Sequence, residues 1–288
     1  MIKKCDNELL ALSKKEINEI NKIQLNIFKY FINICEKNDL KYYAVHGTLL
    51  GAVIHKGFFP FDDDIDVAMP RSDYDKLIKI MQSEKNAPYF LQSNDIESDY
   101  PLVFGKMRDS KTTFIQPILN DFNINKGIYI DIFPIDFLPQ NKFVELILKL
   151  KGKLCTIRIA DRFEKEKSFF KKIVILISKL LIPKWNTAIR MKNRLYSSCK
   201  NSSYCMLYGG KNKESKILYD LFGNGKVVEF EDINIRIPDK YEEYLNIIYT
   251  DYKNYNPAEK LMRNIDEVEV SANIVDTENS YVNYIADK

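Results

Sequence analysis

Four aspartates lie within five consecutive positions and run directly into an apolar segment, and this feature constrains the fold more than any other in the chain. The segment reads DDDIDVAM from Asp62 to Met69. Carboxylates this close repel one another unless solvent or a cation neutralises them. The apolar residues after Asp64 predict a buried strand from Asp64 to Met69. Acidic side chains at the start of a core strand therefore indicate a metal site.

Alternation along this strand predicts which aspartates lie together. Successive side chains point to opposite faces, so Asp62, Asp64 and Asp66 are expected to share a face while Asp63 points away. Residues two apart on a strand are about 6.6 Å apart, so two carboxylates can hold one Mg²⁺ or Mn²⁺ ion or bracket two. We therefore expect Asp64 and Asp66 to be metal ligands.

Three different structures could also contain such a run of aspartates. An EF-hand requires glycine at its sixth position and glutamate at its twelfth, where this chain has Val67 and Asp73. A glycosyltransferase D-x-D motif follows a nucleotide-binding half-domain, but only about sixty residues precede Asp64. The third is a solvated acidic turn, and the apolar strand that follows the aspartates argues against it.

A glycine-rich turn precedes the aspartates and is flanked by the two histidines of the chain. Gly47 and Thr48 open a predicted short helix, where backbone N–H groups and a hydroxyl can bind a phosphate, although a plain turn is the alternative. His46 and His55 can bind a phosphate or transfer a proton near neutral pH, and surface or packing roles are their alternative.

Two later strands carry further candidate residues. The first, Leu102 to Met107, brings Lys106, and Arg108 follows it. Both are candidates to bind a phosphate and to stabilise the charge of a leaving group. In the second, Gly127 to Phe133, three isoleucines face one way and Asp131 faces the other. If the second strand lies beside the aspartate strand, Asp131 supplies a third carboxylate to the metal site. The alternative is an Asp131 paired with a lysine or an arginine.

Composition bounds the domain organisation. A chain of 288 residues with 45% hydrophobic residues suits one large domain or a core with an insertion. We predict an α/β (α+β) fold in which residues 1–140 form a catalytic core with a mixed sheet. Ser13 and Glu16 form a capping box, and apolar residues at steps of three and four after it predict a helix from about Lys14 to Glu36. Alternation from Lys226 to Ile237 predicts a hairpin, and a short helix is expected after it, to about Tyr249. Residues 141–205 are expected to form a basic, helical insertion that faces the acceptor or a membrane, and residues 206–288 to return to the core and cover the site.

The apolar stretch from Phe169 to Pro183 has two possible structures. It is shorter than the span of about 20 residues that crosses a membrane, and lysines interrupt it. It forms either a buried helix or an interfacial helix on an anionic membrane. In the second case Trp185 suits the interface, and the lysines would be anchors: Lys171, Lys172, Lys179 and Lys184.

The overall charge and the cysteines exclude several classes of protein. With 43 basic and 40 acidic residues the formal charge is +3, so no chain-wide field marks a nucleic-acid-binding protein. Five cysteines without C-x-x-C spacing predict free thiols. The first residues contain no secretory apolar region, and a cytoplasmic location is expected.

Taken together, these segments resemble the LicD family of bacterial phosphocholine transferases, which is related to fukutin-type transferases. The resemblance rests on five blocks, which run in the family's order from about residue 40 to residue 261: HGTLLGAVIHKGFFPFDDDIDVAMPRSDYDKL, FGKMRD, GIYIDIFPIDFLP, FEDINIRIPDKYEEYL and TDYKNYNPAEK. It implies a nucleotidyltransferase-like core in which Gly47 and Thr48 hold phosphate, Asp64 and Asp66 bind Mg²⁺, and Asp131 completes the cluster.

The resemblance also implies a reaction. A CDP-alcohol, usually CDP-choline, donates its phospho-alcohol group to a hydroxyl of a cell-surface glycan such as teichoic acid, lipopolysaccharide or capsule, and CMP is released. The acceptor can be lipid-linked, with peripheral contact to the inner membrane. Ile54 and Phe61 differ from the residues common in the family, so glycerol phosphate and phosphoethanolamine are alternative groups. A template-independent nucleotidyltransferase is another alternative.

Overall fold

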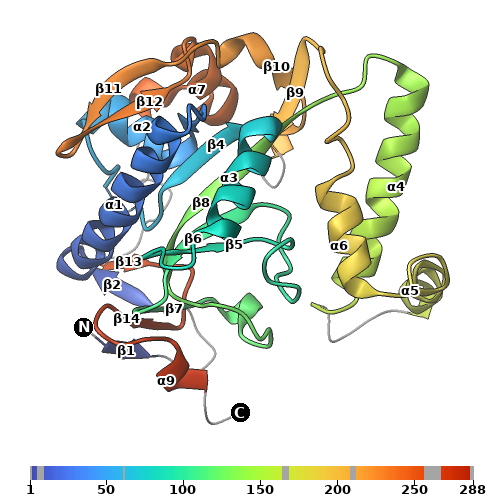
Figure 1. The fold of residues 1–288 in the computed structure, drawn as a ribbon, viewed down its shortest axis with the longest axis horizontal. Coiled ribbons are helices and arrows are strands. Elements are labelled where there is room, and N and C mark those ends of the chain that lie inside the picture. Colours follow the sequence, from blue (N-terminus) through green and yellow to red (C-terminus); the bar gives the residue numbers. More distant parts are fainter. Residues whose placement is uncertain are drawn as a thin grey trace.

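A mixed sheet of seven strands forms the centre of the computed structural model (Figure 1). The structure describes residues 2–4, 10–60, 62–163, 169–207, 212–255 and 267–285. The seven strands, in chain order, are β3 (Tyr43–Ala44), β4 (Asp66–Pro70), β5 (Phe90–Gln92), β6 (Gly105–Asp109), β8 (Ile128–Phe137), β9 (Tyr204–Leu207) and β10 (Ile217–Leu218). Helices pack around this sheet, so the α+β prediction is confirmed.

Strand β8 is the element on which the other strands assemble. It pairs in parallel with β4 along one edge, and with antiparallel β6 and then β9 along the other. All its residues except Phe137 are buried, because α1 and α3 also pack against it. Pro134 has no N–H, and it lies between the last residue paired with β6, Ile132, and the first paired with β9, Ile135. Proline is therefore tolerated in a central strand.

Helices α1, α2 and α3 pack on the sheet and complete the core. Their bounds are α1 (Lys14–Lys37), α2 (His46–His55) and α3 (Arg71–Ser83). Ser13 and Glu16 form the predicted capping box at the start of α1, and its isoleucines and phenylalanines enter the core. Later elements are β11 (Lys226–Phe230) and β12 (Ile233–Ile237), which form the predicted hairpin, α7 (Tyr241–Tyr249) and α9 (Val282–Ile285).

Short strands near the two ends of the chain pair with one another and with β7. They form a three-stranded sheet and a two-stranded sheet beside the core (Figure 1). The strands are β1 (Ile2–Lys4), β2 (Ala11–Ser13), β7 (Thr113–Ile115), β13 (Glu267–Glu269) and β14 (Ile274–Asp276). Single 3-10 turns cover Pro117–Leu119, Asn212–Ser215, Tyr219–Leu221 and Tyr252–Asn254. These pairings bring the two ends of the chain together on one side of the molecule.

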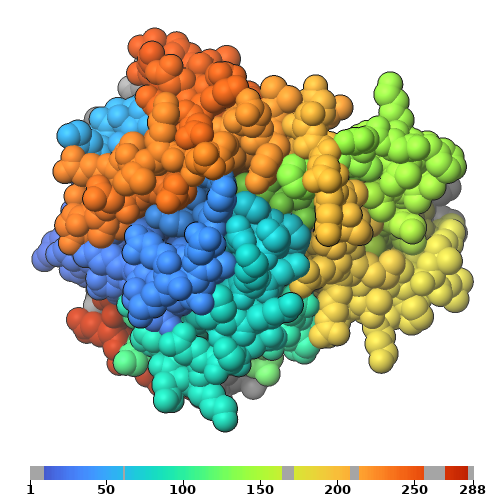
Figure 2. Space-filling view, turned by 45° about the horizontal axis from the view of Figure 1, so that its top comes forward, coloured from blue at the N-terminus to red at the C-terminus, as the bar shows by residue number. Residues whose placement is uncertain are grey.

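Three helices between β8 and β9 form a lobe at the side of the sheet, shown in green and yellow in Figure 2. They are α4 (Lys142–Ala160), α5 (Phe169–Leu181) and α6 (Trp185–Asn193). The lobe has a hydrophobic cluster of its own, in which the indole of Trp185 stacks on Phe122 at 5.5 Å. Trp185 is 8% exposed, so it anchors the lobe to the core and does not lie at an interface with lipid. None of the described helices is long and apolar enough to cross a membrane.

The structure corrects the start of one predicted strand and rejects one of the two alternatives for α5. The strand predicted from Asp64 begins at Asp66, and residues 62–65 form an irregular bend. The helix α5 is not a buried helix, because side chains on its outer side are largely exposed, Leu180 by 75% and Leu181 by 64%. Of the five predicted free thiols, Cys35, Cys155, Cys199 and Cys205 are free, and Cys5 lies outside the described residues.

Candidate active site

Three neighbouring strands bring Asp66, Asp131 and Lys106 into one row. Asp66 on β4 is the direct partner of Asp131 on β8, and Asp131 is the direct partner of Lys106 on β6. Directly paired residues project from the same face of a sheet. Asp131 therefore lies beside the aspartate strand, which meets the condition for its joining the carboxylates, and it also pairs with Lys106, as in the alternative drawn from the sequence. Lys106 was expected from the sequence, but its place next to Asp131 depends on sheet register.

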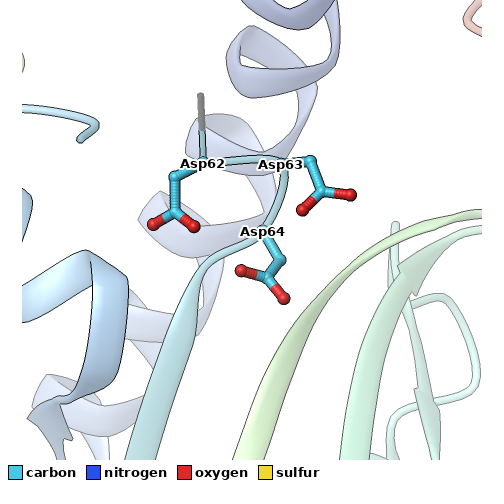
Figure 3. A group of neighbouring side chains, drawn as sticks. All are labelled: Asp62, Asp63 and Asp64. Carbon is cyan, nitrogen blue, oxygen red and sulfur yellow. The ribbon is translucent and has the colours of Figure 1, made fainter. Parts of the chain in front are cut away.

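Carboxylates from two segments meet at the end of this row. Oxygen atoms of Asp64, Asp66 and Asp131 lie within 4.8 Å of one another. Carboxylate oxygens of a second group, Asp62, Asp63 and Asp64, also lie within 4.8 Å of one another. Asp64 belongs to both groups. Figure 3 shows this second group gathered around the bend that leads into β4. Asp63 therefore does not point away from its neighbours, because residues 62–65 do not alternate as a strand does.

The bend is held by hydrogen bonds from distant parts of the chain. The side-chain amide of Gln24 on α1 donates to the backbone carbonyl of Asp63 over 2.7 Å. The backbone N–H of Ser271 donates to the Asp63 carboxylate over 3.2 Å. A Cβ atom at position 47 would collide with the carboxylate of Asp62 and push it aside, so glycine lets this carboxylate lie against the start of α2. These contacts fix the aspartates before any ligand is present.

Burial and like charge make the ionised form of the cluster electrostatically unfavourable on its own. Burial, followed by the charges of Asp66 and its neighbours, raises the pKa of Asp64 well above its usual range. Burial also raises the pKa of Asp131 to about 6, against the opposing effect of the Lys106 ammonium. Carboxylate oxygens are the ligands that Mg²⁺ and Mn²⁺ prefer, and a divalent cation would offset the repulsion. The donor set of Asp64, Asp66 and Asp131 thus fits a hard divalent cation.

Lys106 is the cation closest to these carboxylates among the contacts that the structure records. Its Nζ atom donates to Oδ1 of Asp131 over 2.5 Å and lies 3.4 Å from the centre of the Tyr129 ring. Only 2% of Lys106 is exposed, and this burial lowers its pKa. A buried ammonium group next to a carboxylate cluster can stabilise negative charge on a bound phosphate without being screened by water.

His46 connects the cluster to a buried glutamate that the sequence did not reveal. Its Nδ1 atom lies 3.2 Å from Oδ2 of Asp66, and its Nε2 atom lies 2.7 Å from Oε2 of Glu214. Tyr244 donates its hydroxyl hydrogen to the same glutamate. The backbone of His46 has a φ of 49°, which non-glycine residues seldom adopt, and such geometry is common in active sites. The imidazole is therefore placed between two carboxylates.

Two acceptors on opposite sides favour the doubly protonated imidazole. Burial by itself lowers the pKa of His46, but the hydrogen bonds to Asp66 and Glu214 outweigh it and raise the pKa from 6.5 to about 10. His46 is therefore positively charged at neutral pH when no metal ion is bound. Its physical effect is to hold the Asp66 carboxylate in one orientation.

The remaining predicted residues lie around the cluster. The hydroxyl of Thr48 accepts a hydrogen bond from the backbone N–H of Asp66 over 2.8 Å, which ties the start of α2 to the start of β4. Arg108 is 1% exposed, and its guanidinium donates to Gln92 and to the carbonyl of Gly127. His55 is exposed at the end of α2, with its ring against Phe59. The phosphate-binding roles of these residues stay predictions.

Some features of the site could not be found from the sequence. Glu214 lies in a short 3-10 turn within a polar segment without periodicity, and Tyr244 lies on a helix predicted only as a short element. Asp136, also on β8, pairs with Arg71 and not with the cluster. Residues 206–288 were expected to return to the core and cover the site, and 208–211, 256–266 and 286–288 among them lie outside the described residues.

The charge on His46 predicts how stability depends on pH. The pKa of His46 is raised in the folded state. The stabilisation that its protonated imidazole provides is therefore fully present below pH 6.5 and is lost as the pH rises towards 10. Glu214→Gln removes one of the two carboxylates, and we expect stability to fall less between pH 6.5 and 10 than in the wild type. Urea unfolding of both metal-free proteins across this range measures the difference. Glu229→Gln, which alters an exposed pair with Lys56, is the control. Equal slopes in the wild type and Glu214→Gln would contradict the assignment.

The chain is similar to proteins of one family. Residues 39–164 match the family model described as LicD/FKTN/FKRP, nucleotidyltransferase domain. The chain is 29% identical over 259 residues to the lipopolysaccharide cholinephosphotransferase LicD of Haemophilus influenzae, an alignment that covers 86% of this chain and 95% of that protein. An uncharacterized protein of Rickettsia prowazekii is 32% identical over 109 residues, which cover 38% of this chain and 37% of that protein.

The matched span contains most of the residues of the site. Asp64, Asp66, Asp131 and Lys106 all fall within residues 39–164, whereas Glu214 and Tyr244 come from outside it. An uncharacterized protein of Rickettsia typhi is 42% identical over 60 residues, which cover 21% of this chain and 19% of that protein. The chain therefore carries a LicD-family domain over residues 39–164.

Proposed function

We propose that this chain transfers phosphocholine from CDP-choline to a hydroxyl group of a cell-surface glycan, with release of CMP. The meeting of Asp64, Asp66 and Asp131 within 4.8 Å, inside a LicD-family domain, carries the proposal. The name of the Haemophilus influenzae relative, a lipopolysaccharide cholinephosphotransferase, supports both the group that is moved and a lipopolysaccharide type of acceptor. Phosphoryl transfer needs the donor and acceptor to be oriented and their charge neutralised, and the site has groups for both.

Asp64, Asp66 and Asp131 would hold a Mg²⁺ or Mn²⁺ ion. When bound, such an ion supplies charge neutralisation for the diphosphate of the donor. The imidazolium of His46 keeps one oxygen of Asp66 occupied and leaves the other side of that carboxylate for a ligand. Lys106 holds Oδ1 of Asp131 in the same way.

The proposed reaction is a displacement at one phosphorus atom. The oxygen of the acceptor hydroxyl forms a bond to the phosphorus that carries choline, and the bond from that phosphorus to the bridging oxygen of CMP breaks. The proton of the hydroxyl passes to a carboxylate of the cluster, and the ammonium of Lys106 stabilises the charge that builds up on the leaving CMP. The first turn of α2, at Gly47 and Thr48, offers backbone N–H groups to a phosphate of the donor.

A panel of donors tests this function directly. CDP-choline, CDP-ethanolamine, CDP-glycerol and CMP are each added with Mg²⁺, and the melting temperature is followed. Ligand at about 100 times its dissociation constant stabilises the folded state by about 2.7 kcal/mol. We expect the largest shift with CDP-choline and a smaller one with CMP.

The same panel separates the proposal from its alternatives. A larger shift with CDP-glycerol or CDP-ethanolamine would replace phosphocholine with that group and leave the chemistry unchanged. Absence of a Mg²⁺-dependent shift with all three CDP-alcohols would reject a CDP-alcohol donor. Asp66→Asn serves as the matched variant, since it should lose the part of the shift that depends on Mg²⁺.

A further inference from the structure

Helix α5 is buried on one side and carries exposed large apolar side chains on the opposite side, which is unusual for a helix at the surface. Its inner side is buried against the lobe through Ile175 and Ser178, and Ile182, just after the helix, is buried with them. Its outer side carries large apolar side chains that are 43% to 75% exposed: Ile173, Val174, Leu176, Ile177, Leu180 and Leu181. These positions follow the spacing i, i+1, i+3, i+4, i+7, i+8 of one helix face. We refer to these six residues as the outer face of α5.

Exposed apolar side chains are concentrated in this part of the molecule. The neighbouring helix α4 exposes Phe143 by 70% and Leu150 by 57%. Of the eighteen large hydrophobic residues that are exposed in the described chain, eleven belong to α4 and α5. Single exposed apolar residues are ordinary, but a concentration of them marks a surface that another body covers. The lobe projects from the side of the sheet, so this surface is accessible (Figure 2).

Positive charge is concentrated in the same segment. Residues 141–200 contain sixteen lysines and arginines and four acidic residues, a formal charge of +12, whereas the rest of the chain has 27 basic and 36 acidic residues, a formal charge of −9. Lys172 at the start of α5 and Lys184 just after it are exposed, as are Lys149, Lys151 and Lys153 on α4. The near-neutral chain therefore divides into a basic lobe and an acidic remainder.

Charge decides between two candidate partners for the outer face of α5, a second copy of the chain and a lipid bilayer. In a symmetric dimer this face would meet its own copy, and two lobes of charge +12 would repel each other. An anionic lipid bilayer instead attracts the lysines and takes up the apolar side chains at the boundary between head groups and acyl chains. With thirteen residues, α5 has the length of a helix that lies on a bilayer.

We propose that the outer face of α5 docks on an anionic lipid bilayer, with the lysines around it in contact with the lipid head groups. The proposal goes beyond the transferase function and does not depend on it. In this proposal the lobe holds the enzyme at a membrane surface, and the cluster of carboxylates carries out the chemistry.

Vesicle flotation tests this proposal with the full chain. Wild-type protein is mixed with vesicles of phosphatidylcholine containing phosphatidylglycerol, and separately with vesicles of phosphatidylcholine alone, at low and at high salt. We expect flotation with the anionic vesicles at low salt, reduced at high salt because exposed charges are screened, and little flotation with the neutral vesicles. The variant Leu176→Glu with Leu180→Glu should lower the floated fraction at least tenfold.

Matched variants make the outcomes decisive. Val227→Glu changes a side chain that is 61% exposed on the β11–β12 hairpin and should float as the wild type does. Asp66→Asn should also float normally, which separates docking from the failure of catalysis. Circular dichroism shows that each variant is folded. Absence of wild-type flotation with anionic vesicles would overturn the proposal, as would equal flotation of the double variant. A wild-type dimer that the double variant converts to a monomer, without flotation of either, would identify a second copy as the occupant and also overturn it.

Discussion

Asp66→Asn is expected to reduce transfer from CDP-choline by about 10³-fold or more and to leave the fold intact. The amide has nearly the same shape as the carboxylate but cannot supply the negative charge that a divalent cation requires. Removing a single group that stabilises developing charge in an enzyme costs about 10²- to 10³-fold, and loss of the cation removes a larger stabilisation. Because Asp66 is one of several crowded carboxylates, its neutralisation relieves repulsion on Asp64 in the metal-free protein.

Release of CMP in the presence of an acceptor glycan measures this effect, and calorimetry with Mn²⁺ measures cation binding independently of turnover. Asp64→Asn should behave in the same way, since its carboxylate belongs to both groups of aspartates. Asp232→Asn, which alters an exposed pair with Lys29, is the control and should keep full activity. Wild-type turnover in Asp66→Asn, with a native circular dichroism spectrum, would reject Asp66 as a ligand.

Asp136→Ala is expected to destabilise the protein by about 3–5 kcal/mol, because it removes the carboxylate that pairs closely with a buried guanidinium and leaves only Asp75, at 3.9 Å. Arg71 donates from Nε to Oδ1 of Asp136 over 2.8 Å and from Nη2 to Oδ2 over 2.7 Å. It also donates to the side chain and the backbone carbonyl of Asn193 at the end of α6. The pair thus joins α3, β8 and the helical lobe. A loss of this size is a large fraction of the roughly 5–15 kcal/mol by which proteins are usually stable.

Urea unfolding measures the change in the free energy of unfolding. Asp220→Ala removes one partner of the exposed pair between Asp220 and Lys240, and it should change stability by less than about 1 kcal/mol. A double variant, Arg71→Met with Asp136→Leu, removes both buried charges and should lose less stability than Asp136→Ala. If Asp136→Ala costs no more than Asp220→Ala, the buried pair does not hold the lobe to the sheet.

Local patterns were reliable where one element alone decides the structure. The capping box of Ser13 and Glu16 and the apolar spacing after it predicted α1, because both features act within a few turns of one helix. The alternation in β8 likewise predicted that Asp131 faces away from the isoleucines. The bend at residues 62–65 was missed because its form depends on contacts with Gln24 and Ser271, which are distant in sequence.

Contacts between residues far apart in the sequence could not be predicted, for the same reason. Glu214 lies 168 residues from His46, and no periodic pattern marks it as a buried residue. Arg108 is a candidate phosphate-binding residue from the sequence, yet its guanidinium donates hydrogen bonds to Gln92 and to the carbonyl of Gly127. The sequence of α5 allowed a buried or an interfacial helix, since hydrophobicity alone does not show which sides find a partner.

The sequence by itself determined that carboxylates gather at the start of a core strand and that a LicD-like domain surrounds them. These conclusions depend on residue types and short spacings, which a chain carries into any fold it adopts. Only the tertiary structure decided that Asp131 and Lys106 stand in one row with Asp66, that His46 lies between Asp66 and Glu214, and that α5 presents an uncovered face. The physical reason is that strand register and burial are set by packing between segments far apart in the chain, and no local pattern of residues records them.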